Sequence, residues 1–129
     1  MIPLALLLTA LLFGGMTLFS FGFAAVLFKT FDAPTARRGI RGAFPHYYLW
    51  VIANAGLAGA VLLAVNSMAG TMLIAIALTT IYARQVLMAQ INAATDAGDT
   101  GAFKRLHGIS VVLQLVQIGA AGWALVLLG

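Results

Sequence analysis

Residues 4–28 read LALLLTALLFGGMTLFSFGFAAVLF, an apolar run without one charged side chain. A helix rises 1.5 Å per residue, so about 20 such residues cross the roughly 30 Å hydrocarbon core of a bilayer. Within lipid a backbone must satisfy its own hydrogen bonds, which a helix does inside one segment. The run therefore predicts a membrane-spanning helix. No basic stretch precedes it, so we expect a retained helix rather than a cleaved signal peptide.

Three further apolar runs follow, at about residues 47–65, 71–94 and 106–128. Hydrophobic residues make up 63% of the chain and charged residues 8%, whereas a soluble domain carries about 25% charged residues. So few charges cannot cover a soluble globule. We predict an all-α polytopic membrane protein, with residues 1–129 forming one bundle of four transmembrane helices.

The basic residues predict how the chain lies in the membrane. They gather in the first and third connections, as Lys29, Arg37, Arg38, Arg41, Lys104 and Arg105, and residues 66–70 between them carry none. Cytoplasmic loops are enriched in Lys and Arg. We therefore expect both termini outside and residues 29–45 and 95–105 in the cytoplasm, in a bacterial inner membrane. The basic clusters leave no continuous face for nucleic acid, so the expected partners are the lipid bilayer and a larger membrane-protein complex.

Acidic and thiol chemistry is scarce in this chain. There is no cysteine, and the acids are Asp32, Asp96 and Asp99, all in polar connections. Neither thiol catalysis nor a pair of carboxylates within the membrane is available. We therefore expect a protein that is not an enzyme, and we predict no cofactor. Asp32 before Pro34 resembles a helix start, which leaves either a short interfacial helix or an anchoring loop over residues 36–44.

Polar side chains form a stripe on the last predicted helix. His107, Ser110, Gln114 and Gln117 follow one another at spacings of three, four and three, which places them on one face. Polar groups facing lipid are costly, so this face is expected to point into the bundle. It would serve either interhelical hydrogen bonds or a ligand cleft. If His107 shares this interior, its removal should cost about 1–3 kcal/mol.

Other helices offer partners for this stripe. The third helix carries Thr80 and Arg84, and the second carries Tyr47 and Asn54. No acid lies deep enough to pair with Arg84, so we expect it to snorkel, to meet the glutamines or a backbone carbonyl, or to bind an anion. Together these residues predict a polar interior between the second, third and fourth helices.

His46 and His107 are the two histidines of the chain, and each begins a predicted helix near one interface. They are either unrelated interfacial residues or two axial ligands for haem or copper. Two functions follow. The first is an accessory subunit or small-molecule-handling bundle without a catalytic site. The alternative is a haem- or copper-binding membrane redox protein.

The segment from Ile91 to Asp96, followed by Phe103, Leu106, His107 and Ser110, resembles a known family. Leu27-Phe28 and Phe44-Pro45-His46-Tyr47 look similar to its other motifs. The family is the bacterial four-span membrane domain related to eukaryotic transmembrane protein 205. Gln114 stands where that family often has Asn, and the third helix lacks the family's proline. The resemblance implies a four-span fold and singles out His107 and Ser110, and it implies no reaction.

Overall fold

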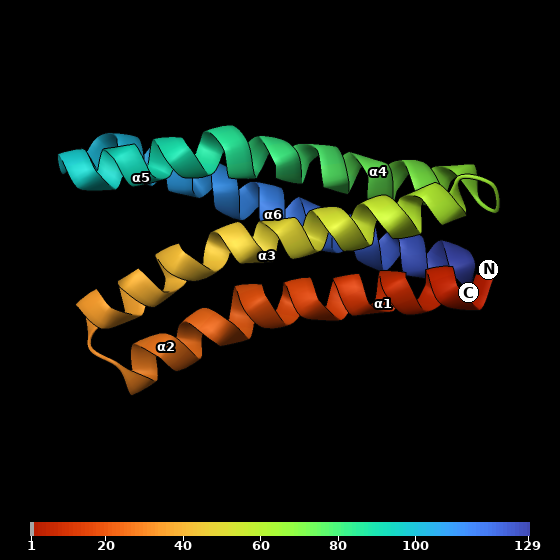
Figure 1. Ribbon diagram of the computed structural model, residues 1–129, viewed down its shortest axis with the longest axis horizontal. Helices are drawn as coiled ribbons and strands as arrows, with labels where there is room; N and C mark the ends of the chain where they lie inside the picture. Colours follow the sequence, from red (N-terminus) through yellow and green to blue (C-terminus); the bar gives the residue numbers. More distant parts are fainter. Residues whose placement is uncertain (1) are drawn as a thin grey trace.

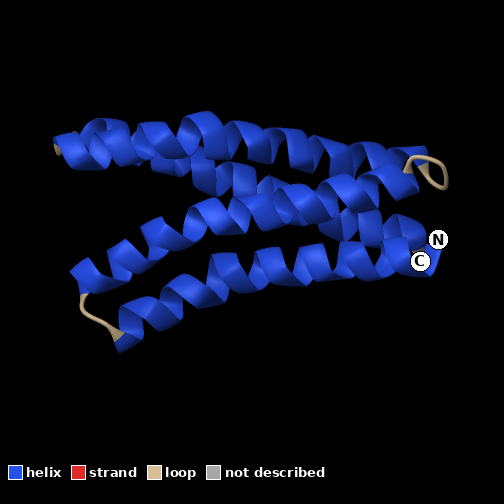
Figure 2. Ribbon diagram, in the orientation of Figure 1, coloured by secondary structure: helices blue, strands red, loops and turns tan. Residues whose placement is uncertain are grey.

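The computed structural model describes residues 2–129, which fold into helices joined by short turns (Figures 1 and 2). Four rods follow one another along the chain. The first consists of α1 (Ile2–Leu18), the π-helical η1 (Phe19–Phe23) and α2 (Ala24–Thr30), and the second is α3 (Ala33–Leu62). The third consists of α4 (Ser67–Tyr82), the π-helical η2 (Ala83–Leu87) and α5 (Met88–Ala97), and the fourth is α6 (Thr100–Leu128). The prediction of an all-α fold is confirmed for this part of the chain.

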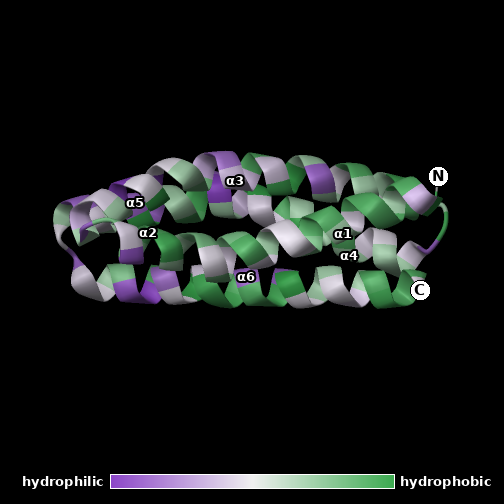
Figure 3. Cartoon of the chain, turned by 90° about the horizontal axis from the view of Figure 1, so that it is seen from below, coloured by the Kyte–Doolittle hydropathy of each residue, from purple (hydrophilic) through white to green (hydrophobic). Residues whose placement is uncertain are grey.

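The rods lie side by side and alternate in direction (Figure 1). α1 packs against α3 and α6, and α4 packs against the same two helices, which closes a ring of four. Both termini and the turn after Leu62 lie at one end, which we call the terminal end. The turns at residues 31–32 and 98–99 lie at the other, which we call the basic end because hydrophilic residues concentrate there (Figure 3).

Three of the rods are long and apolar enough to cross a membrane: Ile2–Thr30, Ser67–Ala97 and Thr100–Leu128. The second rod, α3, runs alongside them over a similar length (Figure 1). Its middle carries Tyr47, Tyr48, Asn54 and several glycines and alanines, so its apolar content is lower. Those residues are mostly buried because α3 packs against both α1 and α4.

Two helices begin earlier than the sequence predicted. The expected starts were residues 47 and 106, but α3 begins at Ala33 and α6 at Thr100. The reason is capping. The Asp32 carboxylate accepts from the Thr35 N–H at 3.4 Å, and Asp99 accepts from the Ala102 N–H at 3.1 Å. These caps satisfy N–H groups that a helix start leaves open, so each helix continues beyond its apolar run.

The connection before residue 47 is therefore neither a loop nor a separate interfacial helix. It forms the first part of α3, which continues through Pro45. A proline inside a helix removes one backbone hydrogen bond. Asp32 caps this helix, and the hydroxyl of Thr35, which donates to its carboxylate, holds the pKa of Asp32 below its usual range.

Small residues set how closely the rods approach. The side chain of Trp50 covers Gly15, and Ile74 packs on Gly59. Gly70 lies against the backbone of Leu63, where even a methyl carbon would come within 2.6 Å of the amide nitrogen. Small residues allow helix backbones to approach this closely. The close contacts therefore lie at only some of the chain's glycines.

Candidate functional site

Three polar side chains with buried polar atoms meet near the middle of the bundle. Ser20 comes from η1, Tyr47 from α3 and Gln114 from α6, and the Tyr47 hydroxyl is turned toward the other two. Ser20 Oγ, Tyr47 OH and Gln114 Nε2 are all buried, and none has a partner at hydrogen-bonding geometry. We call these three residues the tyrosine cluster. Its three members come from three different rods.

Aromatic rings hold Tyr47 in place. The Phe19 ring stacks on the Tyr47 ring, with centroids 3.9 Å apart and planes 8° from parallel. Phe44 meets the same two rings edge-on, with centroids 5.2 Å from Phe19 and 6.1 Å from Tyr47. Offset and edge-on arrangements are the favoured ones for aromatic pairs. The hydroxyl therefore has little freedom to turn away from Ser20 and Gln114.

The first rod brings Ser20 and Phe19 to the cluster through a local irregularity. Both residues lie in η1, one turn of π-helix between α1 and α2. A π-turn adds a residue to the helical repeat, which shifts the face that the following residues present, and such turns recur at functional sites. A second π-turn, η2, interrupts the third rod and carries Arg84.

Tyr48 and Ser110 form a neighbouring contact. The Tyr48 side chain is 4% exposed and its hydroxyl is turned toward Ser110, which is also buried. Its ring lies 5.6 Å from that of Tyr47. The polar surface of the interior therefore extends from the tyrosine cluster toward the basic end of α6.

Gln117 forms a separate hydrogen-bonded contact between α4 and α6. Its Nε2 donates to Thr79 Oγ1 at 2.8 Å and to Thr80 Oγ1 at 3.1 Å. The two threonine hydroxyls donate in turn to the carbonyls of Ala75 and Ile76. Every hydroxyl here has an acceptor, so this contact is structural. Gln117 and Thr80 thus serve an interhelical hydrogen bond.

Arg84 meets a backbone carbonyl, as one of the sequence alternatives proposed. Its Nε donates to the Pro45 carbonyl at 3.3 Å, and one terminal nitrogen donates to Gln85 Oε1 at 2.9 Å. Asn54 does not reach another helix. Its amide donates to the Trp50 carbonyl one turn earlier, at 2.8 Å, because a short side chain reaches its own backbone most easily. That Asn54 lines the shared interior stays a prediction.

Both histidines lie on the surface. His107 is exposed and stacks on Phe103, with centroids 5.4 Å apart, and His46 is exposed on α3. The prediction that His107 heads an inward stripe was wrong. A helix has 3.6 residues per turn. When Ser110, Gln114 and Gln117 are centred on the inward face of α6, His107 therefore lies at the edge of that face. Across residues 2–129 no group of three or more His, Asp or Glu side chains is placed to hold a metal.

Sequence reasoning missed two features. It did not include Ser20, although a serine within a run of phenylalanines was a visible signal. The open polar groups consequently lie between the first, second and fourth rods, not between the second, third and fourth. It also missed the ion pair between Arg41 of α3 and Asp96 of α5.

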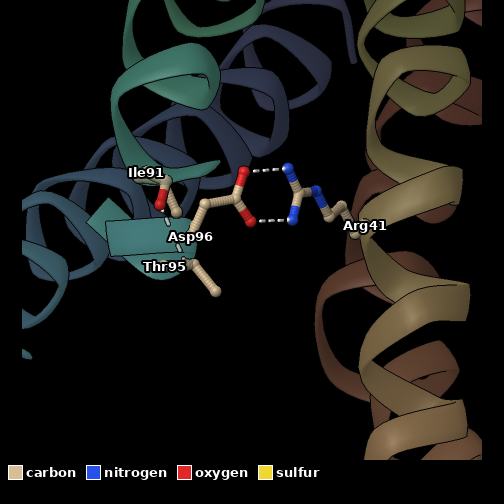
Figure 4. A network of polar contacts seen from close by, with 4 residues as sticks. All are labelled: Arg41, Ile91, Thr95 and Asp96. Carbon is tan, nitrogen blue, oxygen red and sulfur yellow. Dashed lines mark hydrogen bonds and ion pairs between the residues drawn. The ribbon is translucent and has the colours of Figure 1, made fainter. Parts of the chain in front are cut away.

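That ion pair joins the rods at the basic end. The Arg41 guanidinium donates to both oxygens of Asp96, at 2.8 and 3.0 Å (Figure 4). Figure 4 shows the two side chains extended toward each other from separate helices. The bonded guanidinium lowers the pKa of Asp96, and the carboxylate raises the pKa of Arg41. The two residues lie 55 positions apart, so no local pattern predicts their contact.

A family model matches much of this chain. Its description is Domain of unknown function (DUF4149), and it covers residues 7–100, which include Ser20, Tyr47 and Arg84. No curated protein and no solved structure matches the chain. The resemblance to relatives of transmembrane protein 205 stays a prediction. Because the match covers more than half of the sequence, the chain belongs to the family described as a domain of unknown function, DUF4149.

Proposed function

We propose that this chain is a four-span membrane protein that binds a small, neutral, hydrogen-bonding molecule at the tyrosine cluster. The observation that carries the proposal is the convergence of three buried polar atoms that lie near one another without a well-formed hydrogen bond. Leaving such a group unbonded costs about 1–3 kcal/mol. A molecule that both donates and accepts would satisfy the Tyr47 hydroxyl, the Ser20 hydroxyl and the Gln114 amide together.

The chemistry around the cluster supports a neutral ligand. No acidic side chain lies within the apolar runs, and the nearest walls are the rings of Phe19 and Phe44. An ion in such surroundings would need a countercharge. The same surroundings favour binding over catalysis, because a tyrosine, a serine and an amide supply neither a base nor an activated nucleophile.

The four-span topology is part of the proposal. We infer that α3 crosses the membrane with the three more apolar rods, and that the basic end faces the cytoplasm. The concentration of Lys and Arg at one end supports this orientation. An accessory role in a larger complex stays a prediction, which co-purification from native membranes would test. The haem or copper alternative predicts a Soret band or stoichiometric metal in the purified protein.

The binding proposal is tested by extracting small molecules from the protein purified from its own membranes and identifying them by mass spectrometry. We expect one neutral molecule in stoichiometric amount, and we expect Tyr47→Phe to lose it. Tyr48→Phe is the matched control, since its hydroxyl faces Ser110 instead. If both variants and the wild type carry the same content, and Tyr47→Phe is as stable as the wild type, the cluster is not a binding site.

A further inference from the structure

A shallow groove on the outer face of α6 combines two cations with an apolar wall. It is a shallow, open hollow formed by residues of α6 alone, namely Lys104, Arg105, Gly108, Ile109, Val112, Leu113 and Val116. Most of this wall faces away from the bundle, since Ile109 is 49%, Val112 61% and Val116 63% exposed. The groove is therefore open to whatever surrounds the protein.

Its two ends differ in chemistry. Lys104 and Arg105 form the end nearer the first turn of α6, and the rest of the wall is apolar. Over residues 2–129 the one ion pair joins Arg41 to Asp96, which leaves both groove cations without an acidic partner. Positive charge at one end and a hydrocarbon wall at the other complement an anionic head group and its acyl chain.

The groove also has the length of one lipid leaflet. Lys104 and Val116 are twelve residues apart, which is about 18 Å along a helix. Half of a hydrocarbon core is about 15 Å. Gly108 contributes to the hollow because it has no side chain, and a carbon added there would meet nothing within 4 Å.

We propose that this groove binds one anionic phospholipid, with its phosphate at Lys104 and Arg105 and an acyl chain along Gly108, Val112 and Val116. The proposal rests on the membrane embedding inferred above, but not on the tyrosine cluster. It places a specific lipid against α6, the helix that supplies Gln114.

The test uses native mass spectrometry of the full chain, with phosphatidylglycerol and phosphatidylcholine as probes. We expect one phosphatidylglycerol to be retained in preference to phosphatidylcholine. The double variant Lys104→Gln/Arg105→Gln should bind it roughly 20-fold or more weakly, at about five-fold for each cation. The matched control, Arg37→Gln/Arg38→Gln, removes the same charge from exposed positions of α3 and should bind within about two-fold of the wild type.

A second variant separates the groove from diffuse attraction. Gly108→Leu keeps every charge and fills the hollow, and the open space around Gly108 lets the helix accept it. We expect it to lose the retained lipid. Equal weakening in both charge variants with no effect of Gly108→Leu would overturn the site in favour of general surface charge. A dimer mass in place of the lipid adduct would assign the groove to a second copy of the chain and would overturn the proposal too.

Discussion

Gly70 is the position where the fold tolerates least change. It lies in the first turns of α4, against the end of α3. A carbon added there would come within 2.6 Å of the Leu63 nitrogen, 2.8 Å of the Leu63 Cα and 2.9 Å of the Leu62 carbonyl carbon. All three are backbone atoms, so no side-chain rotation relieves the contact. Carbon atoms rest about 3.5–4.0 Å apart, and the two helices would have to separate by roughly 1 Å.

The expected cost of Gly70→Ala follows from two opposing effects. Overpacking of this kind costs about 1–3 kcal/mol, whereas replacing glycine by alanine in a helix contributes up to about 1 kcal/mol. We expect a net loss of about 1–2 kcal/mol. For a chain of this size that lowers the unfolding midpoint by roughly 3–10 °C. Fluorescence of Trp50 and Trp123 in mild detergent reports the midpoint directly.

Gly56→Ala is the matched control for this prediction. Gly56 lies in α3, and an added carbon there meets nothing within 4 Å. The substitution should therefore leave the midpoint unchanged or raise it, by up to about 1 kcal/mol of helix propensity. If Gly70→Ala is as stable as Gly56→Ala, the close approach of α3 and α4 is not as described, and the reasoning from backbone contacts fails.

Three further substitutions and one fusion test the remaining conclusions. Gln117→Leu should lower the free energy of unfolding by about 0.6–1.7 kcal/mol, because it removes interhelical hydrogen bonds from threonines that keep their own acceptors. A larger loss in thermal unfolding would show that Gln117 contributes more than these interhelical bonds. His107→Ala should change the free energy of unfolding by less than about 0.5 kcal/mol, since the ring is exposed. A loss of several kcal/mol would show that the His107 ring lies in the interior of the bundle. The pKa of Asp96 is lowered by Arg41 in the folded state, so the pair's contribution is present above the unfolded pKa of about 3.9 and is lost as pH falls through the lower folded value. Asp96→Asn should abolish that part of the pH dependence of the unfolding midpoint, and an unchanged profile would argue against the pair. A reporter active only outside the cytoplasm should work when fused to Gly129; activity of a cytoplasmic reporter there would invert the topology.

Hydropathy and local sequence patterns are enough to predict the class of fold. Long apolar runs with few charges predict helices that could span a membrane, because a chain in lipid must form helices to satisfy its backbone. The starting signal at Asp32 and Pro34 was also readable locally, because a cap involves residues only three apart. Local hydrogen bonding and hydropathy decide these features, and neither depends on which helices become neighbours.

The tertiary structure decided which polar and small residues meet. The sequence placed Ser110, Gln114 and Gln117 on one face, but it did not reveal that Ser20 joins Gln114 beside the Tyr47 hydroxyl or that His107 is exposed. The chain has many glycines, but the sequence did not show which of them contact a neighbouring helix, as Gly59 and Gly70 do. The helical period specifies only the direction in which each side chain points around the axis of its own helix. The rotation of each helix in the bundle, the shift that a π-turn introduces and the pairing of distant charges depend on the packing of all four rods together.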